Sequence, residues 1–130
     1  MEQSKPKVGQ FCWTDLTLDQ PETVKEFYKE IFGWKEFPVK MKDGEDEYND
    51  FAMAIDETTP GGGICNNRGT NHGMPAQWIT YFNVENIAET IKICLDKGGS
   101  IVKENLKKDG TYNYAILKDP MGIIFGVVNV

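Results

Sequence analysis

The chain has 130 residues, of which 40% are hydrophobic and 26% charged, a size and composition typical of one globular domain with its own core. Its net charge of −6 disfavours binding to nucleic acids or anionic membranes, because both repel an acidic protein. No apolar run is long enough to span a membrane, and residues 1–7 lack the apolar core of a signal peptide. Three cysteines without a CxxC pair indicate reduced thiols, so we expect a cytoplasmic protein.

The first predicted helix follows a predicted strand at residues 10–18. Asp19 or Gln20 is suited to cap this helix, and Pro21 is suited to its first turn. Gly33 is suited to end it in the left-handed conformation. Apolar residues recur between these ends at the spacing of one helical face. They are Val24, Phe27, Tyr28, Ile31 and Phe32.

The second predicted helix repeats this plan. Asn86 is a suitable cap, Glu89 stands where a capping box has an acid, and Gly98 with Gly99 ends the helix. The apolar stripe consists of Ile87, Ile91, Cys94 and Leu95. Gly33 and Gly98 lie 65 residues apart, which is half of the chain. This period indicates an internal duplication.

The segments around the helices alternate between apolar and polar residues, which predicts strands. After each helix come three such segments, at 35–42, 48–55 and 62–65 and at 100–105, 112–118 and 123–128, and a strand at 77–84 precedes the second helix. Each half therefore reads strand, helix, strand, strand, strand. We predict one α+β domain, 1–130, of two βαβββ units at about 8–68 and 75–130. The two units are expected to form one curved mixed sheet with a concave cleft, the default place for a ligand.

Several motifs resemble a known family along nearly the whole chain. They include Trp13-Thr14-Asp15-Leu16, Ile31-Phe32-Gly33-Trp34, Gly62-Gly63-Ile64-Cys65 and Lys118-Asp119-Pro120-Met121-Gly122. The sequence is similar to the glyoxalase/bleomycin resistance protein/dioxygenase superfamily, also called vicinal oxygen chelate proteins, and to a glyoxalase-like subgroup with no settled activity. The resemblance implies the βαβββ fold. It also implies a homodimer, since two-unit members commonly pair around exposed sheet edges.

Members of this superfamily that use a metal carry His or Glu on the first strand of each half and on the last strand of a half. In this sequence those positions offer residues 12–15, residues 77–79 and Gly126. They contain no imidazole and at most one carboxylate, whereas a divalent metal needs several converging ligands. The single histidine, His72, cannot form a site alone. We therefore predict no metal ligands and no cofactor.

Candidate ligand-binding residues lie on the first strand of each half. Alternation places Trp13 and Asp15 on the face away from the first helix. Trp13 is suited either to stacking on a flat ligand or to packing in the core. Asp15 is suited either to acid–base catalysis and ligand binding or to accepting hydrogen bonds from neighbouring donors. Ile79 and Tyr81 share a face in the second half, and Tyr114 is either a ligand-binding hydroxyl or a packed sheet residue.

Arg68 and His72 lie four residues apart in a predicted loop between the halves. Together they are suited to an anionic ligand group, because guanidinium binds carboxylate or phosphate in a forked geometry. The alternative is a surface loop with a salt bridge to one of the many acidic residues. Asp15 and His72 are the two candidate catalytic residues.

These residues favour a glyoxalase-like small-molecule binding protein that works without a metal and holds a small organic ligand in the concave sheet face. The alternative is a lyase or isomerase of the same superfamily, acting by acid–base chemistry through Asp15 or His72. A version dependent on a divalent metal is less favoured by the residues. A structural or interaction protein also fits, because nothing in the sequence demands an open pocket.

Overall fold

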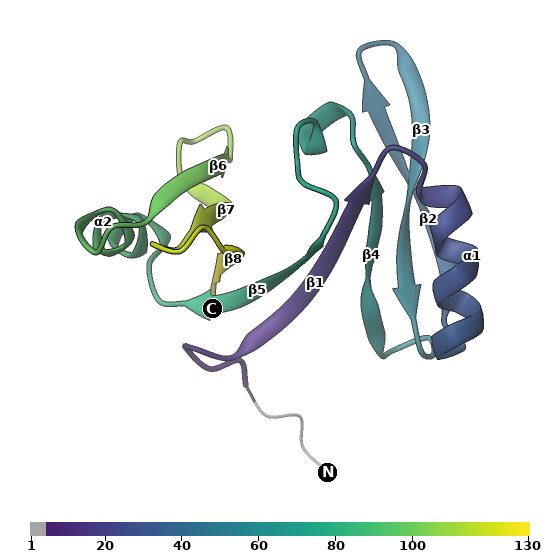
Figure 1. Ribbon diagram of the computed structural model, residues 1–130, viewed down its shortest axis with the longest axis horizontal. Coiled ribbons are helices and arrows are strands. Elements are labelled where there is room, and N and C mark those ends of the chain that lie inside the picture. The colour runs from purple at the N-terminus through teal and green to yellow at the C-terminus, as the bar shows by residue number, and fades with distance from the viewer. Residues whose placement is uncertain (1–4) are drawn as a thin grey trace. The chain divides into compact units, whose positions relative to one another are not determined.

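The computed structural model describes residues 5–130 and shows two consecutive βαβββ repeats (Figure 1). The first repeat consists of β1 (Phe11–Leu18), α1 (Pro21–Phe32), β2 (Lys35–Asp43), β3 (Asp46–Ala54) and β4 (Pro60–Asn66). A short 3₁₀ helix, η1 (Gly69–Asn71), follows it. The second repeat consists of β5 (Trp78–Val84), α2 (Ile87–Asp96), β6 (Ser100–Leu106), β7 (Tyr112–Lys118) and β8 (Ile124–Asn129). The predicted α+β fold and its duplication are confirmed.

The eight strands form a mixed sheet that is not closed, in the order β2-β3-β4-β1-β5-β8-β7-β6. The chain divides into two compact units that we describe separately. Residues 14–78 make up the first-repeat unit, and residues 5–13 together with 79–130 make up the second-repeat unit. The concave cleft expected between the halves stays a prediction. No helix in the described part of the chain is long and apolar enough to cross a membrane.

The strand register repeats between the two units. β1 runs parallel to β4 with Asp15 opposite Gly63, and β5 runs parallel to β8 with Tyr81 opposite Gly126. Asp15 and Tyr81 each lie three residues before the end of their strand, so they occupy equivalent positions. By the same count Trp13 corresponds to Ile79. The duplication seen in the sequence therefore extends to individual backbone pairs.

The first-repeat unit has a core on the α1 side of its sheet. Phe51, Met53 and Ile64 are buried there, with the rings of Tyr28, Trp34 and Trp78 packed against them. The Trp78 indole donates a hydrogen bond of 3.0 Å to the Tyr28 hydroxyl. Trp78 thereby joins the start of β5 to the helix of the first unit.

The helix α1 buries only part of the apolar stripe that the sequence predicted. Tyr28 packs against the core, but Phe27 and Ile31 are each 59% exposed and Phe32 is 55% exposed. The helix also contacts the sheet through its lysines: the Lys25 ammonium lies 4.0 Å from the Phe51 ring centre. Lys25 and Lys29 also pair with Glu36 on β2, at 2.6 and 2.8 Å. Tyr28 and these ion pairs lie on the helix face that meets the sheet, whereas Phe27 and Ile31 are mostly exposed.

The helix α2 covers its sheet as the sequence predicted. Ile87 and Ile91 are buried against residues of β7 and β8, namely Ala115, Leu117 and Val127. The Asn86 side chain accepts a hydrogen bond of 3.0 Å from the Glu89 backbone N–H, which is the predicted cap. The first helix starts differently, because Gln20 is its capping residue and makes no side-chain cap hydrogen bond. Gly33 ends that helix with φ of 70°, as expected for a left-handed terminus.

Candidate functional site

Each unit has a sheet face that carries no helix. On β3, Phe51 and Met53 pack toward α1, so Ala52 between them points to the opposite face, because strand side chains alternate. On β7, Ala115 and Leu117 pack toward α2, so Ile116 points away. We call these surfaces the helix-free faces of the two units. Asp15, Tyr81 and Tyr114 from the predicted site lie on them.

Four residues in register form a line across the helix-free face of the first-repeat unit. We call this line the first row: Asp15 on β1, Gly63 on β4, Ala52 on β3 and Phe37 on β2. Gly63 has no side chain and is buried, and Ala52 has only a methyl group and is partly buried. Phe37 is 43% exposed and Asp15 partly buried. The first row thus places a carboxylate and an aromatic ring on either side of two small residues.

The equivalent line in the second-repeat unit, which we call the second row, is built from different side chains. It consists of Tyr81 on β5, Gly126 on β8, Ile116 on β7 and Lys103 on β6. The Tyr81 ring lies over Gly126 so closely that a Cβ atom at this glycine would collide with it. The position above this glycine is therefore filled by an aromatic ring in the second row.

Tyr81, Tyr114 and Lys103 form a cluster on this face. The rings of Tyr81 and Tyr114 pack edge to face with centres 6.0 Å apart. The Lys103 ammonium donates a hydrogen bond of 3.0 Å to the Tyr114 hydroxyl and lies 5.4 Å from the centre of its ring. Lys103 was not among the predicted site residues. The register of β6 with β7 places it on one face with Tyr114, because Lys103 lies opposite Ile116 and Asn105 opposite Tyr114.

Arg68 is engaged by acidic residues of the β2–β3 hairpin. Its Nε atom donates to Asp43 at 3.1 Å and its terminal nitrogen lies 3.7 Å from Asp46. The guanidinium also lies 4.5 Å from the Tyr48 ring centre. His72 is exposed directly after η1. Acidic side chains therefore hold Arg68 in the described structure, and a shared anion site with His72 stays a prediction.

Of the other two predicted residues, Trp13 is partly buried and Ile79 almost fully buried. They hold equivalent positions, two residues before Asp15 and Tyr81. Because side chains alternate along a strand, both point to the same face as those two residues. Ile79 supplies apolar packing beneath this face.

A buried carboxylate that the sequence analysis missed lies on β3. Asp50 is 5% exposed and accepts hydrogen bonds from the Asn66 backbone N–H at 2.9 Å and side chain at 3.0 Å. The Asn71 side chain donates a third, at 3.4 Å. Burial, followed by the Asp50 charge, raises the pKa of the neighbouring Tyr48 hydroxyl. Asp50 therefore anchors η1 to the middle of β3 and the end of β4.

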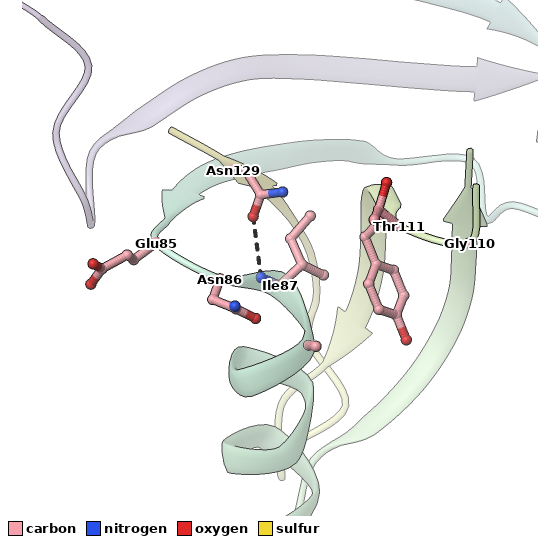
Figure 2. Close-up of a pocket in the computed structure, with 8 residues that line it drawn as sticks. Glu85, Asn86, Ile87, Gly110, Thr111 and Asn129 are labelled. Atoms are coloured by element: carbon pink, nitrogen blue, oxygen red, sulfur yellow. Dashed lines mark hydrogen bonds between the residues drawn. The ribbon is translucent and has the colours of Figure 1, made fainter. Parts of the chain in front are cut away.

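The second-repeat unit also contains a pocket of about 340 Å³, away from the second row (Figure 2). It lies between the start of α2, the β6–β7 turn and the end of β8. In Figure 2, the Asn129 side chain accepts a hydrogen bond of 3.2 Å from the Ile87 backbone N–H, while Glu85 points away from the pocket. The predicted site residues do not line this pocket. The side-chain oxygens of Asn86 and Asn129, which line the pocket, already accept hydrogen bonds from backbone N–H groups at the start of α2.

The residues present do not fit a divalent metal. Among residues 5–130, no three His, Cys, Asp or Glu side chains lie close enough together to hold one. The four equivalent register positions are occupied by Asp15, Gly63, Tyr81 and Gly126. Only Asp15 supplies a carboxylate there, and the two glycines supply no donor.

The comparison with protein families agrees with this architecture. The model of the Glyoxalase/Bleomycin resistance protein/Dioxygenase superfamily matches residues 10–127, so the chain belongs to that superfamily. The protein named "Putative glyoxylase CFP32" of Mycobacterium tuberculosis is 25% identical over 122 residues, covering 94% of this chain and 44% of its own. The anthracycline biosynthesis protein DnrV of Streptomyces peucetius is 27% identical over 128 residues, covering 92% and 46%. The chain thus spans less than half the length of these curated relatives.

Solved structures show the same fold at low sequence identity. A variant of the methylmalonyl-CoA epimerase of Streptomyces coelicolor, in complex with 2-nitronate-propionyl-CoA, has a TM-score of 0.55 and 14% identity. The match covers 95% of this chain and 98% of the epimerase chain. A hypothetical protein of Bacillus halodurans, BH1468, has a TM-score of 0.58 and 12% identity, with 95% and 96% covered. These structural similarities establish the fold only.

Proposed function

We propose that this protein is a glyoxalase-like small-molecule binding protein that works without a resident metal and holds an organic ligand on its helix-free faces. The first row carries the proposal. It places a partly buried carboxylate, a floor of Gly63 and Ala52, and a half-exposed Phe37 ring in one line. Small-molecule sites typically combine apolar walls with a few placed polar groups, and this row has that composition.

The chemistry of the row suits a ligand with a hydrogen-bond donor and a flat apolar part. An ionised Asp15 carboxylate accepts hydrogen bonds from hydroxyl or amide groups. The Phe37 ring offers a face for stacking, and glycine lets the ligand approach the backbone closely. A metal is not required for this kind of binding, and the donor set argues against one. The names of the relatives and the shared fold support a ligand-binding role of this kind.

Thermal denaturation of chelator-treated protein against a library of small organic acids, aldehydes, amides and alcohols tests the proposal. We expect some compounds to raise the melting temperature without added metal, and Asp15→Asn to weaken their binding at least tenfold. Asp96→Asn, which alters an exposed carboxylate at the end of α2, is the matched control and should leave binding unchanged. Binding that appears only after Zn²⁺, Ni²⁺, Mn²⁺ or Fe²⁺ is added would overturn the proposal. Turnover of a bound compound that Asp15→Asn abolishes would replace it with acid–base catalysis.

We also propose that two copies of the chain associate. Phe27, Ile31 and Phe32 give α1 an exposed apolar surface that a second copy would bury. The curated relatives are more than twice as long as this chain. A second copy of this chain would give an assembly with a comparable number of residues. Sedimentation equilibrium should therefore show a dimer that Ile31→Glu converts to a monomer. A monomer in the unchanged protein would contradict this.

A further inference from the structure

We infer that the second-repeat unit binds a small, neutral aromatic molecule of one or two rings on the helix side of its sheet, in a pocket distinct from the one beside Asn129. This pocket, which we call the Cys94 pocket, has a volume of about 220 Å³. It lies between the C-terminal half of α2, the turn between β7 and β8, and the start of β8. The inference is independent of the first row, whose residues belong to the other unit.

The first-repeat unit shows which side chains fill the equivalent space there. Tyr28 and Cys94 are each the eighth residue of their helix. Trp34 and Gly99 each stand between a left-handed glycine and the strand that follows the helix. The rings of Tyr28 and Trp34 pack against the core of the first-repeat unit, with their centres 6.2 Å apart. Two aromatic rings therefore occupy positions that hold a thiol and a glycine in the second-repeat unit.

The second-repeat unit fills only part of this space with its own side chains. Phe125 supplies one ring, at the position that Gly62 holds on β4. A side chain at residue 99 cannot supply another, because a Cβ atom on Gly99 would collide with the Cys94 sulfur and the Lys118 carbonyl oxygen. The pocket of about 220 Å³ remains. An apolar cavity of about 150 Å³ is already large enough to hold benzene, so one or two rings fit here.

The lining of the Cys94 pocket favours a neutral apolar guest. The apolar side chains that line it are Ile93, Leu117, Pro120 and Phe125. Two charged residues also line it, Lys97 and Asp119, and their charges are of opposite sign. The Asp119 carboxylate accepts hydrogen bonds from the backbone N–H groups of Met121, at 2.8 Å, and Ile123, at 3.0 Å. Because this carboxylate is held by its own turn, the guest gains its affinity from apolar contact and from packing on the Phe125 ring.

Titration with indole, followed by amide chemical shifts in NMR, tests the inference. We expect the shifts to concentrate in residues 90–99 and 117–125, and indole to bind at least tenfold more tightly than imidazole, a polar aromatic ring. Cys94→Phe should abolish indole binding, because it places a ring in the pocket from the position equivalent to Tyr28. Cys12→Phe makes the same change at an exposed cysteine of the same unit, and this matched control should leave indole binding intact.

A second measurement does not depend on how Cys94→Phe folds. The chain has three cysteines, so Cys94 is the one thiol left after Cys12→Ser and Cys65→Ser. Saturating indole should slow the alkylation of this thiol by iodoacetamide at least fivefold, because the ring covers the sulfur. Unslowed alkylation, or chemical shifts confined to residues outside the pocket, would overturn the inference.

Two further outcomes would assign the pocket or the compound differently. If Asp15→Asn weakens indole binding and Cys94→Phe leaves it intact, the compound binds on the first row. That result would overturn the Cys94 pocket as its site and support the proposed function. If indole does not bind and Cys94→Phe converts a dimer to a monomer in sedimentation equilibrium, a second copy of the chain occupies the pocket, and the inference of a small aromatic guest is overturned.

Discussion

The two units share a backbone frame and differ in what they place on it. In both, the strand before the helix pairs in parallel with the last strand of the repeat, and the residue three positions before its end lies opposite a glycine. In the first-repeat unit that residue is Asp15, and in the second it is Tyr81. The two units keep the same strand register, but the acid of the first-repeat unit corresponds to an aromatic residue in the second-repeat unit. A site can therefore be located by register even where its chemistry has diverged.

The helices show the same divergence in packing. The helix α2 packs on its sheet by burying Ile87 and Ile91. The helix α1 packs on its sheet through the single ring of Tyr28 and through ion pairs of Lys25 and Lys29 with Glu36. Burial of apolar surface gives the larger stabilisation, because partly exposed ion pairs contribute little. The two units should therefore respond differently to equivalent substitutions.

The largest difference is expected from truncating an isoleucine on each helix. Ile91→Ala should lower the free energy of unfolding by about 2–5 kcal/mol, because it leaves a cavity in the core of the second-repeat unit. Ile31→Ala should cost less than about 1 kcal/mol, because that side chain is 59% exposed. Urea denaturation measures both in dilute protein. Equal losses would show that α1 is packed more tightly than its exposure indicates.

A loss of similar size should follow removal of the buried carboxylate in the first-repeat unit. Asp50→Ala leaves three donors on Asn66 and Asn71 without their acceptor, at a cost of about 2–3 kcal/mol. It should also release η1, which hydrogen exchange at residues 69–73 would detect. Glu47→Ala, at an exposed acid on the same strand, serves as the control. Unchanged exchange in Asp50→Ala would remove the anchoring role.

A smaller effect is expected from a methyl group added to the second row. Gly126→Ala forces the Tyr81 ring aside and should cost about 1–3 kcal/mol through overpacking. In a Tyr81→Ala background the same change should be nearly neutral, because the colliding ring is gone. A double-mutant cycle in urea gives the coupling directly. Additive losses would mean that the ring does not occupy the space above Gly126.

The smallest effect concerns pH and the ion pairs of α1. Hydrogen bonds from Lys25 and Lys29 hold the pKa of the Glu36 carboxyl below its ordinary value of 4.5. A carboxyl whose pKa is lower in the folded state than in the unfolded state stabilises the fold at pH values above its unfolded-state pKa. This stabilisation is lost as the pH falls through the folded-state pKa. Stability should therefore fall below about pH 4.5, and Glu36→Gln should lose less over the same range. Identical pH profiles for both proteins would eliminate this contribution.

The regular elements were readable from the sequence because their signals are local. Proline and glycine marked the ends of α1, Asn86 and Glu89 marked the start of α2, and alternating side chains marked the strands. The length of the repeat was visible in the spacing of Gly33 and Gly98. The packing of α1 was not visible, because an amphipathic pattern does not reveal that Lys25 and Lys29 find a partner on β2.

The site was only partly readable, since it depends on which strands become neighbours. Asp15, Tyr81 and Tyr114 were predicted to share faces of their strands, and alternation places each on a helix-free face. Gly63, Ala52 and Lys103 were missed, because only the strand register brings them into rows with Asp15 and Tyr81. Arg68 was predicted to meet a ligand, and its pairing with Asp43 and Asp46 depends on the β2–β3 hairpin folding back beside η1.

The central claim is that ligands bind on the helix-free rows without a metal. A crystal structure of the chelator-treated protein, soaked with a compound that raises its melting temperature, tests it most directly. The account predicts electron density for the compound against Asp15, Ala52 and Phe37, with no metal ion in contact. Density for the compound in the pocket beside Asn129, or bound to a metal ion, would contradict it.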